Sequence, residues 1–421
     1  CQPGLTASGV PPRMARATPA ARHPLANCGN IEMPNKPDLS PETVAAQAGG
    51  AVDPATGAII PPIHLASTYE RDADLTYPKG FIYGRPDNAI IRQAEDVITS
   101  LEGGDRTLLL PSGMAAATTL FLTLEAPAHV IAPRVMYWSL RNWLAETAPR
   151  FGIETTFVDA TDLDAISAAI QPGHTRLIWL ETPAHPLWHI SDIAAVAQIA
   201  HGAGALLAVD STCASPALTC PLALGADVVM HSATKYLNGH SDVLAGSLTF
   251  SRTGQAPAII ERAAAYRASF GSILGPLEAA LLLRGMRTLF VRVARQSQSA
   301  LEVARAMTGN AAVAEVLYPG LEEHPAHHLA KRQMANGFGG RLSIRVAGGE
   351  AAAVQTAAAL TLWKRATSLG GVESLVEHRA SIEGPASPCP PDLLRFSVGL
   401  ENPADLVADL QHALAQTRNG R

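Results

Sequence analysis

The chain has 421 residues, a net charge of -5 at pH 7, 47% hydrophobic residues and 16% charged residues. This length predicts about two or three domains, and so low a charge content excludes a disordered chain. The acidic balance gives no general attraction to nucleic acid or anionic lipid, and no stretch is apolar enough to span a bilayer, so we expect a small-molecule substrate and neither a nucleic-acid nor a membrane partner.

The first half of the chain predicts an α/β fold. Residues 1–40 are rich in proline, and we expect a disordered tail there. Apolar residues recur with helical spacing from Ile90 to Leu101, before a pair of glycines. Short apolar runs then alternate with helical stretches, and we expect strands at 107–110, 129–132, 176–180, 205–209 and 227–230. Short strands separated by helices indicate a large, mostly parallel sheet with helices on both faces.

The second half predicts a smaller domain. A helical stretch rich in Ala, Leu and Arg is expected from Leu277 to Met307, connecting the two domains. Strands are expected at 341–346 and 393–398, followed by a closing helix from Ala404 to Leu414. Because helices and strands are mixed in this part, the pattern favours an α+β domain.

Lysine is rare in this chain, where only five of the 32 basic residues are lysine. A lysine kept where arginine is otherwise used offers a deprotonable amine, which a guanidinium does not. Lys235 follows an expected strand in a loop rich in hydroxyl groups, and Asp210 follows another. Because ligands bind beyond the carboxyl ends of parallel strands, we expect both to face one crevice. A buried ion pair or an exposed loop lysine fits the same pattern, so these residues alone leave the function open.

The segment Asp227 to Ser241, DVVMHSATKYLNGHS, resembles the lysine signature of the trans-sulfuration enzymes of Cys/Met metabolism, which use pyridoxal phosphate (PLP). The resemblance runs from about Pro61 to Leu414. It implies the PLP-dependent transferase fold of type I, with a tail over 1–40, an arm over 41–88 that reaches a neighbouring subunit, a PLP-binding domain over 89–280 and a C-terminal α+β domain over 281–421. It also implies a Schiff base between Lys235 and PLP, with Asp210 against the pyridine nitrogen.

The sequence also offers a site for the cofactor's phosphate. Gly113 and Met114 follow an expected strand and open a helix, whose first backbone N–H groups attract anions. Alone, this is a helix-cap pattern, but it resembles the family's phosphate-binding turn. The resemblance adds the hydroxyl groups of Ser232 and Thr234 as further phosphate ligands.

A segment of the arm implies a shared active site. Tyr83 and Arg85, in IYGRPDN, resemble the family's Tyr-x-Arg pair, which reaches the phosphate of the neighbouring subunit's cofactor. A homodimer or homotetramer with shared active sites is therefore expected. The family's Asn-Pro-Thr continuation is replaced here by Asn88-Ala89-Ile90.

Two further residues match positions around the cofactor ring. Tyr137 occupies the place where the family stacks a tyrosine on the ring, although an aromatic residue after a strand is more often ordinary packing. His185, in ETPAHP, replaces the family's asparagine that binds the cofactor's phenolic oxygen, and imidazole is able to donate the same hydrogen bond. Trp138 replaces the family's glycine after the stacking tyrosine.

The C-terminal segments TSLGGVES and LRFSVGLE resemble the family's substrate-binding segments. The resemblance implies that Arg395 holds the α-carboxylate of an amino acid by two parallel hydrogen bonds, with Ser368 nearby. Thr367 stands where cystathionine γ-lyases and γ-synthases often carry glutamate, and Ser139 stands where methionine γ-lyases carry cysteine. The choice of substrate therefore stays open.

Five cysteines without CxxC spacing suggest neither a disulfide framework nor a zinc site, so a cytoplasmic protein is expected. The resemblance implies an enzyme with β- or γ-elimination or γ-replacement activity on a sulfur-containing or O-activated amino acid, with cystathionine as expected substrate or product. Lys235, Tyr137 and Asp210 are the expected catalytic residues. Another PLP reaction, such as decarboxylation or aldol cleavage, and a non-catalytic PLP-binding protein stay open. An NAD enzyme is disfavoured because no GxGxxG follows any expected strand. The histidines of 324–328 lie in an expected surface loop without a cluster of carboxylates or cysteines, so no metal is expected.

Overall fold

The computed structural model describes residues 39–419 except 51, 54, 255 and 385–386. Two sheets dominate the fold. The expected tail over 1–40 lies outside the described residues apart from its last two positions.

The larger sheet has seven strands in the order β1-β7-β6-β5-β4-β2-β3. It is formed by β1 (Arg106–Leu110), β2 (Ala128–Pro133), β3 (Ile153–Val158), β4 (Thr175–Glu181), β5 (Leu206–Asp210), β6 (Val228–His231) and β7 (Gly246–Phe250). The strands β2 to β6 pair in parallel, whereas β7 is antiparallel to both β1 and β6. The expected strands of this half are confirmed, and β3 and β7 are additional.

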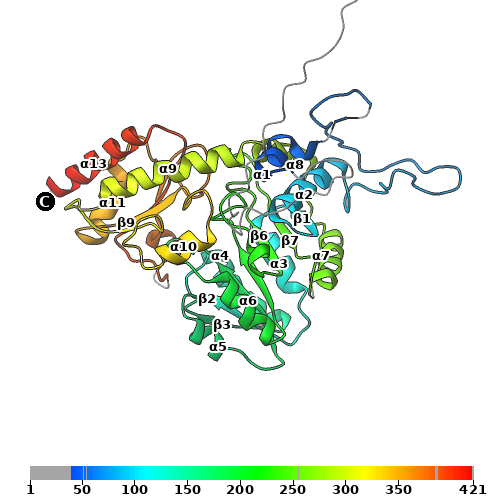
Figure 1. The fold of residues 1–421 in the computed structure, drawn as a ribbon, viewed down its shortest axis with the longest axis horizontal. Coiled ribbons are helices and arrows are strands. Elements are labelled where there is room, and N and C mark those ends of the chain that lie inside the picture. The colour runs from blue at the N-terminus through cyan, green and yellow to red at the C-terminus, as the bar shows by residue number, and fades with distance from the viewer. Residues whose placement is uncertain (1–38, 51, 54, 255, 385–386, 420–421) are drawn as a thin grey trace, which may run out of the picture.

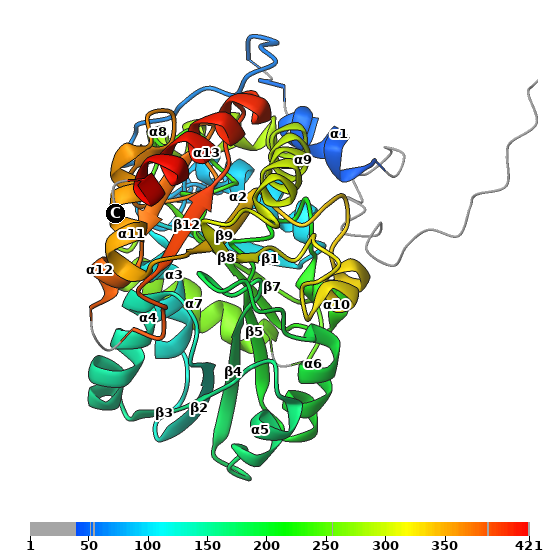
Figure 2. The same cartoon turned by 90° about the vertical axis from the view of Figure 1, so that its left-hand side faces the viewer.

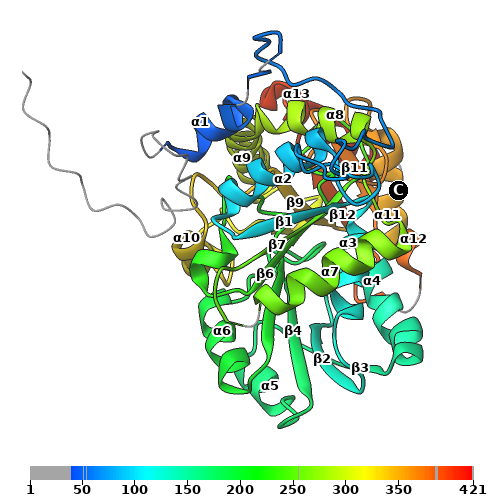
Figure 3. The same cartoon turned by 90° about the vertical axis from the view of Figure 1, so that its right-hand side faces the viewer.

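Helices cover both faces of this sheet (Figure 3). They are α2 (Ala89–Glu102), α3 (Gly113–Leu122), α4 (Trp138–Asn142), α5 (Leu163–Ala168), α6 (Ile193–Gly202), α7 (Ala256–Phe270) and α8 (Pro276–Met286). Alternate strand residues point to opposite faces. Trp179 accordingly packs with Phe121 of α3, while the adjacent Ile178 packs with Val196 of α6. The expected α/β arrangement with helices on both faces is thus confirmed.

The helix expected from Leu277 to Met307 is wrong as a single element, because α8 ends at Met286 and α9 (Leu289–Met307) begins after a break. The backbone carbonyl of Gly285 accepts hydrogen bonds from Arg292 Nη2 at 2.8 Å and from Thr288 Oγ1 at 3.2 Å. The backbone N–H of Thr288 also donates to this carbonyl at 3.3 Å, so α8 closes with a tight turn and does not continue into α9.

The smaller sheet has five strands in the order β10-β11-β12-β9-β8, and only β10 and β11 pair in parallel. Its strands are β8 (Val313–Leu317), β9 (Arg341–Val346), β10 (Lys364–Arg365), β11 (Leu375–His378) and β12 (Leu393–Ser397). Its helices are α10 (His327–Gln333), α11 (Gly349–Ala359), α12 (Ala380–Glu383) and α13 (Pro403–Asn419). This mixture of helices and mostly antiparallel strands confirms the expected α+β domain. The closing helix α13 starts one residue earlier and ends five residues later than the expected Ala404 to Leu414.

The two parts meet at the carboxyl ends of the parallel strands (Figure 2). The smaller sheet, with α9, α11 and α13 on its outer side, lies above the ends of β4 and β5. Its core includes Leu342, Phe396 and Leu410. Side chains at the ends of these strands therefore face the edge of the smaller sheet.

A short helix, α1 (Pro41–Ala46), precedes an arm that runs over residues 52–88 and extends away from the body (Figure 1). The arm exposes apolar side chains, including Ile59, Ile60 and Leu65 at 75%, 64% and 77%. Isolated exposed apolar residues are normal, but a run of them on an extended segment is typical of a surface that another chain covers. No helix in the described part of the chain could cross a membrane.

Candidate active site

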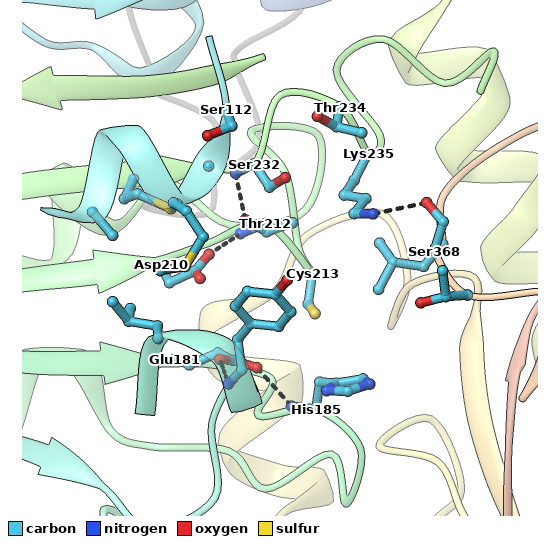
Figure 4. Close-up of a pocket in the computed structure, with 18 of the residues that line it drawn as sticks. Ser112, Glu181, His185, Asp210, Thr212, Cys213, Ser232, Thr234, Lys235 and Ser368 are labelled. Carbon is cyan, nitrogen blue, oxygen red and sulfur yellow. Dashed lines mark hydrogen bonds between the residues drawn. The ribbon is translucent and has the colours of Figure 1, made fainter. Parts of the chain in front are cut away.

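A cavity of about 240 Å³ lies where the two sheets meet. Figure 4 shows it, with Lys235 and Ser368 on the right and Asp210 and Glu181 on the left. All the site residues expected from the sequence line it, apart from Tyr83 and Arg85: Gly113, Met114, Tyr137, His185, Asp210, Ser232, Thr234, Lys235, Ser368 and Arg395. The fold therefore brings together segments that are far apart in the sequence.

The start of α3 forms one end of the cavity. Ser112 caps this helix, because its hydroxyl accepts from the backbone N–H of Ala115 at 3.1 Å. The N–H groups of Gly113 and Met114, in the first turn, have no carbonyl within the helix. A Cβ at Gly113 would lie 2.8 Å from Cβ of Ser232, so only glycine allows the helix to approach this loop so closely. The result is a site with free backbone donors beside a hydroxyl group, which suits a phosphate.

The loop that carries Lys235 is fixed by backbone contacts. The Thr234 hydroxyl accepts from the N–H of Ala245 at 2.9 Å, and the N–H of Thr234 donates to the carbonyl of Ala245 at 3.1 Å. The N–H of Lys235 donates to the carbonyl of Ser232 at 3.0 Å. This anchoring holds the lysine at a defined position after β6.

The amine of Lys235 points across the cavity to the smaller sheet, where Nζ donates to the Ser368 hydroxyl at 2.7 Å (Figure 4). Burial, followed by the positive charges of Arg395 and Arg341, lowers the pKa of Lys235 to about 8. An amine with such a pKa is neutral in a useful fraction of molecules near neutral pH, so it is able to act as a nucleophile or a base.

Asp210 ends β5 directly beside Glu181, which ends β4 in the paired register. Burial raises the pKa of Asp210, and burial together with the charge of Asp210 raises the pKa of Glu181 to about 8. Two adjacent buried carboxyl groups rarely both ionise, so this pair keeps a proton to a higher pH than either carboxyl group would alone. The N–H of Thr212 donates to Asp210 Oδ1 at 3.0 Å. A positively charged ligand beside Asp210 would stabilise its buried carboxylate, so this end of the cavity favours a cationic group.

Glu181 also fixes two other residues of the cavity wall. Its Oε2 accepts from the backbone N–H of Tyr137 at 2.6 Å, and its Oε1 accepts from the backbone N–H of His185 at 2.9 Å. The sequence pointed to Glu181 only as part of the ETPAHP segment, without a role. Its contacts hold both the aromatic ring and the imidazole in place.

The imidazole of His185 is neutral. Burial, followed by the charges of Arg395 and Arg379, lowers the pKa of His185 well below its usual value. Arg395 Nη1 donates to Nε2 of His185 at 3.0 Å, so the ring proton is on Nδ1. The imidazole is therefore a hydrogen-bond donor at Nδ1.

Arg395 is buried on β12, with only 2% of its surface exposed. Its Nη2 lies 2.6 Å from Glu377 Oε2 and donates to the carbonyl of Ser368 at 2.8 Å. Nε of Arg395 has no hydrogen-bond partner among the described residues. Ser368 itself has a φ of +96°, which is rare for a residue other than glycine. The guanidinium thus stands in a fixed position with a spare donor.

Several lining residues carry no signal in the sequence. Cys213 and Arg379 belong to this group, together with Thr212, which follows Asp210 closely. Cys213 Sγ accepts from Arg341 Nη1 at 2.8 Å, but burial raises the pKa of this thiol to about 12, so it is not a nucleophile. Arg379 is an isolated arginine in the sequence, and only the fold shows that it reaches the cavity.

Tyr83 and Arg85 lie outside the cavity of their own chain. Tyr83 is 46% exposed, and the guanidinium of Arg85 lies 5.8 Å from its ring centroid and donates to the carbonyl of Ala268. Their contact with a neighbouring subunit's phosphate stays a prediction.

The cavity fits a phosphorylated aromatic aldehyde. The free N–H groups of α3 face one end, and the close approach at Gly113 leaves no room for a side chain there. A buried carboxylate suits a protonated ring nitrogen, and the amine of Lys235 suits an aldehyde. In the described part of the chain, no cluster of three or more His, Cys, Asp or Glu residues could hold a metal ion.

Comparisons with known proteins agree with this chemistry. The family model of the Cys/Met metabolism PLP-dependent enzymes matches residues 42–415. The chain is 42% identical over 380 residues to cystathionine gamma-synthase of Mycobacterium tuberculosis, covering 89% of this chain and 96% of the relative. It is 37% identical over 399 residues to L-methionine gamma-lyase of Porphyromonas gingivalis, covering 90% and 98%.

A crystal structure of cystathionine gamma synthase from Xanthomonas oryzae pv. oryzae, in complex with aminoacrylate and cysteine, has the same fold. The TM-score is 0.86 at 33% identity, and the match covers 91% of this chain and 100% of that chain. The expected type I fold of PLP-dependent transferases is thereby confirmed. The chain belongs to the Cys/Met metabolism family of PLP-dependent enzymes.

Proposed function

We propose that this enzyme catalyses γ-replacement, in which the thiol of cysteine displaces an O-acyl group from an activated homoserine to give cystathionine. The observation that carries the proposal is the single cavity in which Lys235, Asp210 and Arg395 meet. The 42% identity to a relative named cystathionine gamma-synthase supports this reaction. γ-Elimination is the second candidate, supported by the 37% identity to L-methionine gamma-lyase.

In this proposal each part of the cavity holds one part of the cofactor. The residues expected to hold it are Gly113, Met114, Ser232 and Thr234 for the phosphate, Asp210 for the ring nitrogen, Tyr137 for the ring face, His185 for the phenolic oxygen and Lys235 for the aldehyde. When bound, PLP supplies an electron-withdrawing ring that stabilises negative charge on the substrate's α carbon.

The protein's own groups then orient the substrate and move its protons. The buried guanidinium of Arg395, which lines the cavity, binds the α-carboxylate. The neutral amine of Lys235, held by Ser368, takes the α proton and returns protons during the later steps. The buried carboxyl group of Asp210 is expected to hold the ring nitrogen in its protonated form.

We further propose that a second copy of the chain completes the site. Tyr83 and Arg85 lie outside the cavity of their own chain, on an arm whose apolar side chains are exposed. In a dimer the arm over 41–88 would be covered, and it would bring this pair to the partner's phosphate site. The two sheets support a division of the remaining chain into domains over 89–280 and 281–421.

The direct test is a substrate panel on the purified PLP-loaded enzyme. With L-cysteine and either O-succinyl- or O-acetyl-L-homoserine we expect cystathionine, measured by mass spectrometry. Pyruvate and 2-oxobutyrate are scored separately, because they report loss of the β or the γ substituent. Pyruvate as the main product would indicate β-elimination, and carbon dioxide would indicate decarboxylation. Either result would contradict the proposed γ-replacement. Bound cofactor without turnover of any of these amino acids would favour a non-catalytic PLP-binding protein.

A further inference from the structure

The wall of the cavity contains a second buried guanidinium, Arg379, which has no role in the reaction described above. Arg379 is 5% exposed and follows β11, whereas Arg395 lies on the neighbouring strand β12. One oxygen, Glu377 Oε2, lies 2.9 Å from Arg379 Nη1 and 2.6 Å from Arg395 Nη2. The shared oxygen holds the two guanidinium groups side by side, and both line the cavity.

Arg379 keeps donors that the protein does not use. Its Nε and Nη2 donate to Glu383 Oε1 at 2.9 and 2.6 Å, and its Nη1 donates to Glu377. These contacts use three of the five N–H groups of a guanidinium. The remaining N–H groups lie one on each terminal nitrogen, where they are able to donate to a ligand in the cavity.

The charges around this end of the cavity favour a further anion. The positive charges of Arg395, Arg379, Arg341 and Lys235 all act to lower the pKa of His185. The carboxylates of Glu377 and Glu383 contact the arginines but do not line the cavity. Asp210 and Glu181 lie on the far side of the cavity from Ser368 (Figure 4). A ligand near Ser368 therefore meets guanidinium groups rather than carboxylates.

We propose that Arg379 is a specificity-determining residue that binds a second carboxylate, carried on the substrate's side chain, while Arg395 binds the α-carboxylate. The inference rests on the proposed function of Arg395. The α-carboxylate binds at Arg395, and the neighbouring guanidinium of Arg379 is within reach of the same small molecule. The enzyme thus prefers amino acids esterified with a dicarboxylic acid, which leaves as a dicarboxylate, over those esterified with a monocarboxylic acid.

The test compares two esters in one enzyme preparation. The wild type, Arg379→Met and Arg379→Lys are assayed in their PLP-loaded form with L-cysteine and either O-succinyl- or O-acetyl-L-homoserine. We expect the ratio of kcat/KM for the succinyl ester to that for the acetyl ester to fall about 10- to 100-fold in Arg379→Met. In Arg379→Lys, which keeps the charge but lacks the guanidinium group, we expect a smaller fall. A ratio that Arg379→Met leaves unchanged overturns the inference, even if both activities fall.

Two further variants separate recognition from folding. Arg379→Met leaves Glu383 without its buried partner, so the double variant Arg379→Met/Glu383→Gln removes both charges together and should show the same fall in the ratio. Arg345→Met removes a partly exposed arginine on β9 that pairs with Asp392, and should leave the ratio unchanged. The inference is contradicted if the ratio falls equally in Arg345→Met or stays unchanged in the double variant.

Binding of unreactive amino acids gives a readout without turnover. L-2-Aminoadipate, a dicarboxylate, should change the visible absorbance of the bound cofactor at lower concentration than L-norleucine does, and Arg379→Met should abolish this preference. If the wild type uses neither ester, the proposed function fails. If it turns over both esters with no preference for the succinyl ester, only the role of Arg379 fails.

Discussion

The two sides of the cavity are built by different interactions. On the side of the larger sheet, backbone geometry fixes the polar groups, because Asp210 ends a strand, Gly113 opens a helix and the loop of Lys235 is bonded to Ala245. On the side of the smaller sheet, long guanidinium side chains are fixed by buried carboxylates. We infer that the first side fixes the cofactor chemistry, whereas the second side selects the substrate and is more easily changed by substitution.

The strongest test of the first side is the removal of its amine. Lys235→Ala should lower kcat at least about 1,000-fold, because both covalent capture of the cofactor and proton transfer depend on this group. Steady-state kinetics with the substrates named above measure the loss. Lys364→Ala, which removes an exposed lysine on β10, is the control and should keep full activity. Activity of Lys235→Ala within tenfold of the wild type would contradict the assignment.

The second side is tested by Arg395→Gln. The neutral amide loses two charge-assisted hydrogen bonds to the substrate carboxylate, so KM for the amino acid should rise about 100-fold. The amount of PLP bound per subunit should change little, because Arg395 is not among the residues expected to hold the cofactor. Loss of the cofactor with an unchanged KM would contradict the assignment of cofactor binding to the larger-sheet side and substrate binding to the smaller-sheet side.

The pH dependence of cofactor capture tests the environment of Lys235. The amine attacks an aldehyde only when neutral, and its pKa is lowered to about 8. The rate constant for capture of PLP by the apoprotein should therefore fall about tenfold for each pH unit below 8 and level off above it. Stopped-flow absorbance measures this rate. A rate that keeps rising steeply beyond pH 9 would indicate a lysine with its ordinary pKa.

Glu181→Gln should have the smallest effect. The side chain keeps its shape, but its NH₂ group replaces one of the two oxygens that accept from Tyr137 and His185. One backbone N–H then loses its acceptor, which costs about 1 to 3 kcal/mol and should weaken cofactor affinity by about tenfold. The circular dichroism of the bound cofactor should also change, since the ring contacts shift. An unchanged cofactor affinity and an unchanged spectrum would contradict the claim that Glu181 holds Tyr137 and His185 in place.

The elements that the sequence predicted are those with a continuous apolar pattern. The strands β2, β4 and β5 are buried along nearly their whole length, so each gives an apolar run. β3 is an edge strand with sequence IETTFV, and its polar, partly exposed residues hide it. β11, LVEH, ends with buried Glu377 and His378, which read as a loop in the sequence.

The site residues divide in the same way. Asp210 and Lys235 could be singled out because each follows an expected strand, but their roles, like those of Tyr137 and His185, came from the family resemblance. Arg379 gives no such signal. Its position in the cavity wall depends on its ion pairs with Glu377 and Glu383, and the sequence does not show that these three side chains are buried together. The role proposed for Tyr83 and Arg85 depends on a second chain, so no contact within one chain tests it.

The most direct experiment reduces the purified, cofactor-loaded enzyme with borohydride and maps the digested protein by mass spectrometry. If the larger-sheet side of the cavity is where the cofactor is captured, the peptide containing residue 235 carries the pyridoxyl mass, and every other lysine peptide is unmodified. A pyridoxyl group on a different lysine, or on none, would contradict the account.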